Sequence, residues 1–97
     1  RKNNKNRDTM RRDYNDPVYR DWRVQVYKRD KFTCQMPGCS YKKYLNAHHI
    51  QKWASASSLR FDVDNGITLC KNCHKKVTGS EQHYQGLFQQ IVRKNNG

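Results

Sequence analysis

Four cysteines stand in two close pairs, and three of the four histidines lie between the pairs or directly beside one of them. Cys34 and Cys39 are separated by four residues, and Cys70 and Cys73 are separated by two. A tetrahedral zinc site needs two such pairs, because each pair on a tight turn can aim both of its thiolates at one ion. The spacing therefore predicts a structural Zn²⁺ held by all four sulfurs.

Disulfides are the rival interpretation of the cysteines, and they need an oxidising, secretory context that nothing in the sequence indicates. A redox pair at Cys70 and Cys73 would leave the other two cysteines unexplained. A closed four-cysteine site has no open coordination position, so we expect the zinc to support the fold and take no part in a reaction. Thiolate binding couples metal to folding, so a strong chelator should unfold the domain.

The histidines suggest a second, reactive site. His48 and His49 are neighbours, and neighbouring residues of a strand point to opposite faces. At the end of a strand, where the backbone turns, they can still serve one site in different roles. His74 follows Cys73, and on a helix it projects about 100° away from that cysteine. Any one of these histidines alone would more often be a packed or surface residue, so only the three together indicate a reactive site.

The elements that must position these residues can be placed coarsely. Asp16 followed by Pro17 is typical of a helix start, and Tyr19, Trp22 and Val26 continue at helical spacing. This pattern predicts a helix over about residues 17–29. Its aromatic side chains are better explained as core than as base-stacking groups, because they share one face with valines.

Further along the chain, short strands are expected at residues 45–50 and 67–69, with a loop at 54–58 and a turn at 64–66. A short helix is expected over about residues 71–77, ending near Gly79. Ser80 is expected to cap a last helix, with Glu81 in its first turn. The apolar face of that helix would consist of Tyr84, Leu87, Phe88 and Ile91.

Composition limits the class of protein. The chain has 97 residues and a formal charge of +12, from 20 Lys and Arg against 8 Asp and Glu. We expect one domain over residues 16–97, preceded by a flexible basic arm at 1–15. Such a basic balance favours a polyanionic partner. No apolar run approaches the length of a membrane span or a signal-peptide core, so we expect a soluble, cytoplasmic protein without a membrane partner.

The order of the motifs resembles the HNH endonucleases, in the zinc-bound, four-cysteine form found in phages and bacteria. It runs from Cys-x4-Cys through AHHI at 47–50 to NGITLCKNCH at 65–74, and RDKFTCQ at 29–35 and LRFDVDNGITLC at 59–70 are similar too. The resemblance covers about residues 18–90. It implies a small α+β protein with a ββα-metal core and flanking helices. It also implies a metal-dependent DNA endonuclease, working in a bacterial or phage-infected cell.

The resemblance also implies roles for single residues. His49 matches the general base, and Asn65 matches the central asparagine that braces the loop and orients that base. His48 and His74 match the ligands of a catalytic divalent cation. Mn²⁺, Mg²⁺ or Ni²⁺ is expected there, and zinc could bind without supporting turnover.

One family position differs in this chain. Some members carry another histidine ligand four residues after the position of His74, where this chain has Thr78. Either the cation has two protein ligands, with water and phosphate completing its shell, or Glu81 or His83 contributes. For both of these a surface or capping role is the competing explanation.

The expected reaction is hydrolysis of a phosphodiester bond, by nicking or by double-strand cleavage. It needs an activated water, neutralised charge on the scissile phosphate and a stabilised leaving oxygen. A histidine with a pKa of about 6.5 is a suitable base at neutral pH, and one divalent cation can supply the other two requirements. The resemblance implies products with 5′-phosphate and 3′-hydroxyl ends.

Binding of DNA should be mainly electrostatic, through contacts of basic side chains with phosphates. The candidate residues lie in the arm and around the motifs, namely Arg11, Arg12, Lys42, Lys43, Lys52 and Arg60. No small-molecule cofactor is expected. A larger phage or restriction assembly is a setting that the resemblance allows.

Two other functions compete with the nuclease. A non-catalytic, zinc-stabilised nucleic-acid-binding module would explain the charge and the cysteines, but it leaves the three histidines and Asn65 as coincidence. A protein-interaction zinc domain with a basic surface would bind DNA only weakly. Changing His49 to alanine distinguishes the first alternative from an enzyme, because only an enzyme has cleavage to lose.

Overall fold

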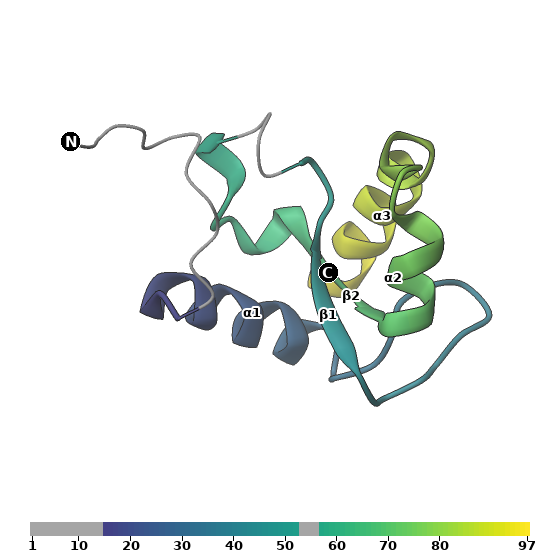
Figure 1. Cartoon of the computed structure of the whole chain (residues 1–97), viewed down its shortest axis with the longest axis horizontal. Coiled ribbons are helices and arrows are strands. Elements are labelled where there is room, and N and C mark those ends of the chain that lie inside the picture. Colours follow the sequence, from purple (N-terminus) through teal and green to yellow (C-terminus); the bar gives the residue numbers. More distant parts are fainter. Residues whose placement is uncertain (1–14, 53–56) are drawn as a thin grey trace.

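The computed structural model describes residues 15–52 and 57–97 (Figure 1). Most of the expected arm, with Arg11 and Arg12, lies outside the described residues, as does most of the loop expected at 54–58. The elements follow the order α1 (Pro17–Arg29), β1 (Leu45–His49), η1 (Ser57–Leu59), η2 (Val63–Asn65), β2 (Gly66–Cys70), α2 (Lys71–Val77) and α3 (Glu81–Asn96), where η marks a short 3₁₀ helix. This is the small α+β architecture that the sequence predicts.

Helix α1 has the predicted bounds, and its start is fixed by a cap. The Asp16 carboxylate accepts a hydrogen bond of 2.9 Å from the backbone amide of Val18, and proline occupies the first turn. Tyr19, Trp22 and Val26 are buried, which confirms them as core. Val18 and Val24 are exposed, so of the valines only Val26 shares the buried face.

Strands β1 and β2 form an antiparallel ribbon in the register Leu45↔Cys70 to His49↔Gly66. Helix α1 covers one face of this ribbon, while α2 and α3 lie on the other side (Figure 1). Gly66 and Thr68 of β2 face α1, whereas Ile67 and Leu69 belong to the core cluster under α2 and α3. The alternation of side chains therefore sends adjacent residues into two different environments.

The close approach of α1 to the ribbon depends on Gly66. A Cβ atom at this position would lie 2.5 Å from Cγ2 of Val26 and 2.6 Å from Cζ2 of Trp22. Both distances are far below van der Waals contact, so any larger residue would force the helix away from the strand. The core cluster on this face consists of Tyr19, Trp22 and Val26.

The last two helices cover the other face. Helix α2 has its predicted bounds, and Phe88 and Val92 of α3 are buried. Ser80 occupies the N-cap position of α3 and Glu81 lies in its first turn, as expected, but two details differ. The Ser80 side chain makes no capping hydrogen bond, because the tight turn from α2 places its backbone outside the extended conformation that a capping residue adopts. Leu87 is 39 % exposed, because the buried face of α3 runs through Phe88 and Val92.

Within the described residues, no helix is both long and apolar enough to span a lipid bilayer.

Candidate active site and metal centre

The four cysteines converge as their spacing predicts. Their sulfur atoms all lie within 4.8 Å of one another, and the Sγ atoms of Cys39 and Cys70 are 4.0 Å apart. Tetrahedral zinc with Zn–S bonds of about 2.3 Å places its sulfurs about 3.8 Å apart, so the cluster has the dimensions that such an ion needs. All four thiols are free, so the cysteines do not pair as disulfides.

The cluster is assembled from two local turns. Cys39 follows Gly38, whose φ of +86° favours glycine, and its amide donates to the carbonyl of Met36 over 2.9 Å. Cys70 ends β2, and Cys73 lies on the first turn of α2. The junction of β2 with α2 thus places Cys70 and Cys73 beside the earlier pair. The pairing of β1 with β2 holds these two distant parts of the chain together.

The thiols are not electrostatically equivalent. The backbone amide of Cys73 is the main cause that lowers the pKa of Cys70 to about 7. Burial instead raises the pKa of Cys34 and of Cys73. Cys70 is therefore the sulfur most easily present as a thiolate, whereas Cys34 and Cys73 hold their protons more tightly in the metal-free protein.

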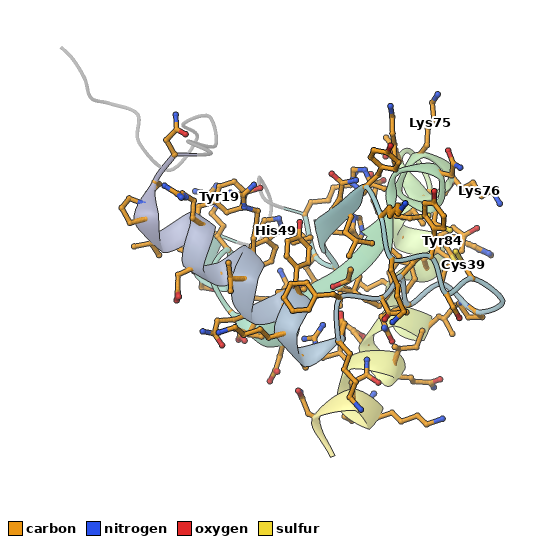
Figure 2. All side chains as sticks on the ribbon, turned by 90° about the horizontal axis from the view of Figure 1, so that it is seen from below. Tyr19, Cys39, His49, Lys75, Lys76 and Tyr84 are labelled. Atoms are coloured by element: carbon orange, nitrogen blue, oxygen red, sulfur yellow. The ribbon has the colours of Figure 1, made fainter. Side chains whose placement is uncertain are left out.

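His49 lies at the end of β1 on the α1 face and is 5 % exposed. Its ring stacks on Trp22 with centroids 4.1 Å apart and planes 11° apart, and Tyr19 lies beside it with centroids 6.2 Å apart (Figure 2). His49 Nε2 is 2.8 Å from the carbonyl oxygen of Arg60. Because a carbonyl only accepts, Nε2 carries the proton, and in the neutral ring Nδ1 then carries the lone pair.

His48 points to the opposite face of the ribbon, as adjacent strand residues must. Its ring lies edge-on to that of His74 with centroids 5.5 Å apart, and to that of Phe88 with centroids 5.7 Å apart. The fold thus brings together the two imidazoles that the sequence assigns to one cation. In the part of the chain that the structure describes, only the cysteines form a converged set of three or more metal-binding side chains.

Asn65 fastens the loop that follows β1 to the start of β2. Its side-chain oxygen accepts from the amide of Gln51 over 2.9 Å. Its side-chain nitrogen donates to the carbonyls of Gln51 over 3.1 Å and of Leu59 over 3.3 Å. Leu59 precedes Arg60, whose carbonyl holds His49, so Asn65 restrains the backbone directly before the histidine's partner.

Thr78, at the missing ligand position, and the two candidate ligands Glu81 and His83 have different surroundings. The Thr78 hydroxyl donates to the carbonyl of His74 over 2.8 Å, and His83 is exposed and packs edge-on against Tyr84. Backbone amides of Glu81 and Gly79, and then the charges of Lys52 and His48, lower the pKa of Glu81. Of the three residues, Glu81 is the one that offers a carboxylate, and its lowered pKa favours the charged form.

A polar cleft of about 250 Å³ opens beside Glu81. Across it Lys52 Nζ lies 3.9 Å from a carboxylate oxygen of Glu81. The loop after β1 and the first turns of α3 line the cleft with Ile50, Gln51, Lys52, Glu81, Gln82 and Gln85.

The basic residues named from the sequence differ in exposure. Lys42 and Lys43 are exposed, and Lys42 Nζ donates to the hydroxyl of Thr33 over 2.9 Å. Arg60 is only 9 % exposed, so most of it is covered and it is a poor candidate for a phosphate contact. Sequence reasoning missed Lys75 and Lys76, which project outward from α2 next to His74 (Figure 2).

Sequence reasoning also missed the contact of Trp22 with His49. It assigned the tryptophan to the core, and the residue is indeed 2 % exposed. Its indole nitrogen donates to the carbonyl of Asp62 over 2.8 Å, which fixes the plane of the ring against the histidine. No local sequence pattern predicts this contact, because Trp22 lies in α1 and His49 lies in β1.

Comparison with known proteins gives one match. Residues 34–80 match the family model described as HNH endonuclease. No curated protein and no solved structure matches the chain significantly. The matched stretch includes the four cysteines, Asn65 and the histidines of β1 and α2. With the ββα arrangement and the converged cysteines of the structure, this match shows that residues 34–80 carry the pattern of the HNH endonuclease family.

Proposed function

We propose that the protein is a metal-dependent endonuclease that hydrolyses phosphodiester bonds in DNA, with His49 as the general base. The observation that carries the proposal is the fixed tautomer of His49. The Arg60 carbonyl holds the proton on Nε2 over 2.8 Å, so Nδ1 carries the lone pair that would take a proton from water, once the side chains that cover this atom in the structure admit one. The Trp22 ring holds the imidazole plane, and its π face also attracts the cationic ring that forms on protonation.

His48 and His74 are proposed to hold a divalent cation on the other face of the ribbon. Two neutral imidazoles suit Mn²⁺ or Ni²⁺ better than Mg²⁺, which prefers oxygen ligands. Glu81 is the third ligand we favour because its carboxylate would add an oxygen donor, and its side chain would have to move toward the histidines, since the three residues do not form a converged set in the described structure. Such a cation, when bound, supplies Lewis-acid polarisation of the phosphate and charge stabilisation of the leaving oxygen.

The proposed structural ion of the cysteine cluster is zinc, because four thiolates at tetrahedral spacing favour it. It joins the turn after α1 to the β2–α2 junction, so it fixes the helix that carries His74. A chain with so small a core gains positional precision from such an ion.

DNA is proposed as the substrate because the formal charge of +12 favours a polyanion. Lys75 and Lys76 directly follow His74 and are exposed, while Lys52 lies in the loop after β1. Contacts from such side chains go to phosphates, which gives affinity without reading sequence.

The test is incubation of the zinc-loaded protein with supercoiled plasmid and manganese or magnesium. We expect conversion to open circles by the parent and no conversion by His49→Ala. The matched control, Gln90→Ala on the exposed side of α3, should cleave like the parent. A chelator added in slight excess over manganese should stop cleavage, with zinc content measured in parallel.

The opposite outcome favours the second candidate. Intact plasmid from a folded, zinc-loaded parent that still retards DNA on a gel would indicate the non-catalytic, zinc-stabilised nucleic-acid-binding module. The converged cysteines support that module as well as they support the nuclease.

A further inference from the structure

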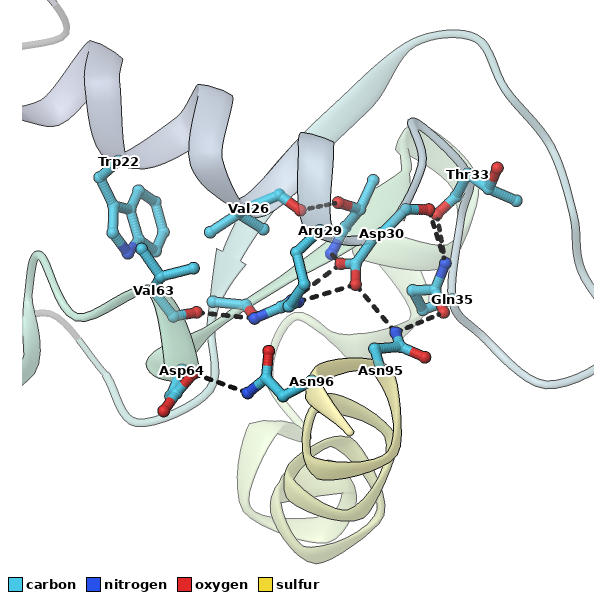
Figure 3. A network of polar contacts seen from close by, with 12 residues as sticks. Trp22, Val26, Arg29, Asp30, Thr33, Gln35, Val63, Asp64, Asn95 and Asn96 are labelled. Atoms are coloured by element: carbon cyan, nitrogen blue, oxygen red, sulfur yellow. Dashed lines mark hydrogen bonds and ion pairs between the residues drawn. The ribbon is translucent and has the colours of Figure 1, made fainter.

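A buried ion pair closes the end of α1. Arg29 Nε and one terminal nitrogen each lie 2.9 Å from an oxygen of Asp30, and the two side chains are only 8 % and 0 % exposed (Figure 3). Removing two charges from water is costly, so such a pair is retained only when further hydrogen bonds satisfy both partners. The other hydrogen bonds of Arg29 and Asp30 identify the segments of the chain that this ion pair connects.

The guanidinium of Arg29 reaches two backbone carbonyls on either side of Asn65. One terminal nitrogen donates to the carbonyl of Val63 over 2.8 Å, and the other donates to the carbonyl of Gly66 over 2.6 Å (Figure 3). These carbonyls bracket the junction of η2 with β2. Arg29 therefore clamps the backbone at both sides of the asparagine that braces the loop.

Asp30 fixes the clamp to the rest of the fold. One carboxylate oxygen accepts from the backbone amide of Thr68 in β2 over 2.9 Å, and the other accepts from the side-chain amide of Asn95 in α3 over 2.9 Å. The carboxylate thus holds the guanidinium in a plane set by a strand and a helix. Neither of these two hydrogen bonds involves a proposed metal ligand.

We propose that Arg29 is a positioning residue for the reaction and acts on His49 through Asn65. The clamp fixes the backbone of Asn65, and the Asn65 side chain fixes Gln51 and the carbonyl of Leu59. The next carbonyl along the chain, that of Arg60, holds His49 Nε2. The inference deepens the proposed function, because its consequence for cleavage rests on His49 as the base.

Arginine is required here because of its geometry. Its planar fork makes four directed hydrogen bonds at once, two to the carboxylate and two to the carbonyls. Lysine keeps the charge opposite Asp30 but offers one compact ammonium, which cannot span both carbonyls. Arg29→Lys therefore separates the charge of the residue from its clamping role.

The first measurement is amide hydrogen exchange, which needs no nuclease activity. The amides of Gln51 and Ile50 donate to the side chain and to the backbone carbonyl of Asn65. In Arg29→Lys we expect both to exchange at least about tenfold faster, because they open with the loop. Val92→Ala, in the core beneath α3, should lower the melting temperature and leave the local protection of these two amides unchanged.

The second measurement is steady-state cleavage of a duplex. Arg29→Lys should reduce kcat about 100-fold, as expected for a misplaced catalytic group, and leave KM near the parent value. Val92→Ala should keep the kcat of the parent below its melting temperature. A merely structural role for Arg29 would make the two variants alike in kcat and in the exchange of Gln51.

Two outcomes would overturn the inference. They are parent-like exchange at Gln51 in Arg29→Lys, or parent-like kcat in that variant from an active parent. An inactive parent with fast exchange at Gln51 in the variant would contradict the proposed function and leave the clamp supported. If Arg29→Lys does not fold, the double variant Arg29→Gln with Asp30→Asn replaces it, because it leaves no buried charge unpaired. Amide exchange and steady-state cleavage are then measured on this double variant.

Discussion

Trp22 and His49 stack almost in parallel, with ring centroids 4.1 Å apart, across the contact between α1 and the end of β1. The indole nitrogen of Trp22 donates to the carbonyl of Asp62, and Nε2 of His49 donates to the carbonyl of Arg60. Both anchors are backbone carbonyls of the segment between the two strands. The core of the α1 face and the proposed base are therefore one packed unit, and a change in one alters the other.

Replacing Trp22 by phenylalanine tests that unit. The variant keeps an aromatic face but loses the hydrogen bond to Asp62, so the ring can tilt away from His49. We expect kcat to fall about tenfold, which corresponds to about 1.4 kcal/mol of transition-state stabilisation. Tyr27→Phe, which loses a hydrogen bond from α1 to the carbonyl of Leu45 at the far end of β1, is the matched control. Equal cleavage by both variants and the parent would show that the stack is only packing.

Zinc removal should unfold the domain, because the cysteine cluster joins segments far apart in the sequence. Cys39→Ser should lower the melting temperature strongly, while Ser40→Ala, at the next position, should match the parent. Circular dichroism with zinc analysis measures both. A metal-free protein that keeps the parent melting temperature would contradict the structural role of the ion.

The zinc affinity should depend on pH in a stated direction. Burial raises the pKa values of Cys34 and Cys73, so in the metal-free protein these thiols carry protons at neutral pH. Binding must displace those protons, and therefore affinity falls as pH falls. Competition with a chromogenic chelator between about pH 6 and 8 measures the slope, with a value near zero arguing against thiolate ligation.

Glu81→Gln tests the third ligand of the proposed cation site. Loss of the carboxylate should weaken manganese binding to the zinc-loaded protein by about tenfold or more, measured by calorimetry. Lys52→Ala removes the cation that competes for Glu81 and should strengthen manganese binding. If Glu81→Gln binds manganese like the parent, His48 and His74 hold the cation with water alone.

Exposed lysines of α2 should contribute to DNA affinity. The double change Lys75→Ala and Lys76→Ala should weaken binding at every sequence and reduce the slope of log affinity against log salt by about two. The pair Arg93→Ala and Lys94→Ala removes the same charge from the far end of α3 and serves as control. Equal slopes for both double variants would indicate that only net charge matters.

The sequence by itself determined the elements and the liganding pairs. The helix at 17–29 follows from a cap, a proline and an apolar period, all within one segment. The cysteine cluster follows from two short spacings on turns, and the opposite directions of His48 and His49 follow from strand alternation. These features depend on residues close together in the chain, and local propensity fixes them.

Only the tertiary structure decided which residues meet. Arg29 reaches Val63 and Gly66, which lie 34 and 37 positions away, and Trp22 reaches Asp62 across 40 positions. The burial of Arg60 and the exposure of Leu87 were likewise decided by neighbouring elements. Such contacts depend on how α1 and α3 dock on the ribbon, and docking is set by the packing of all side chains together. The candidate residues of the site could therefore be named from residue types and spacing, whereas their orientation could not.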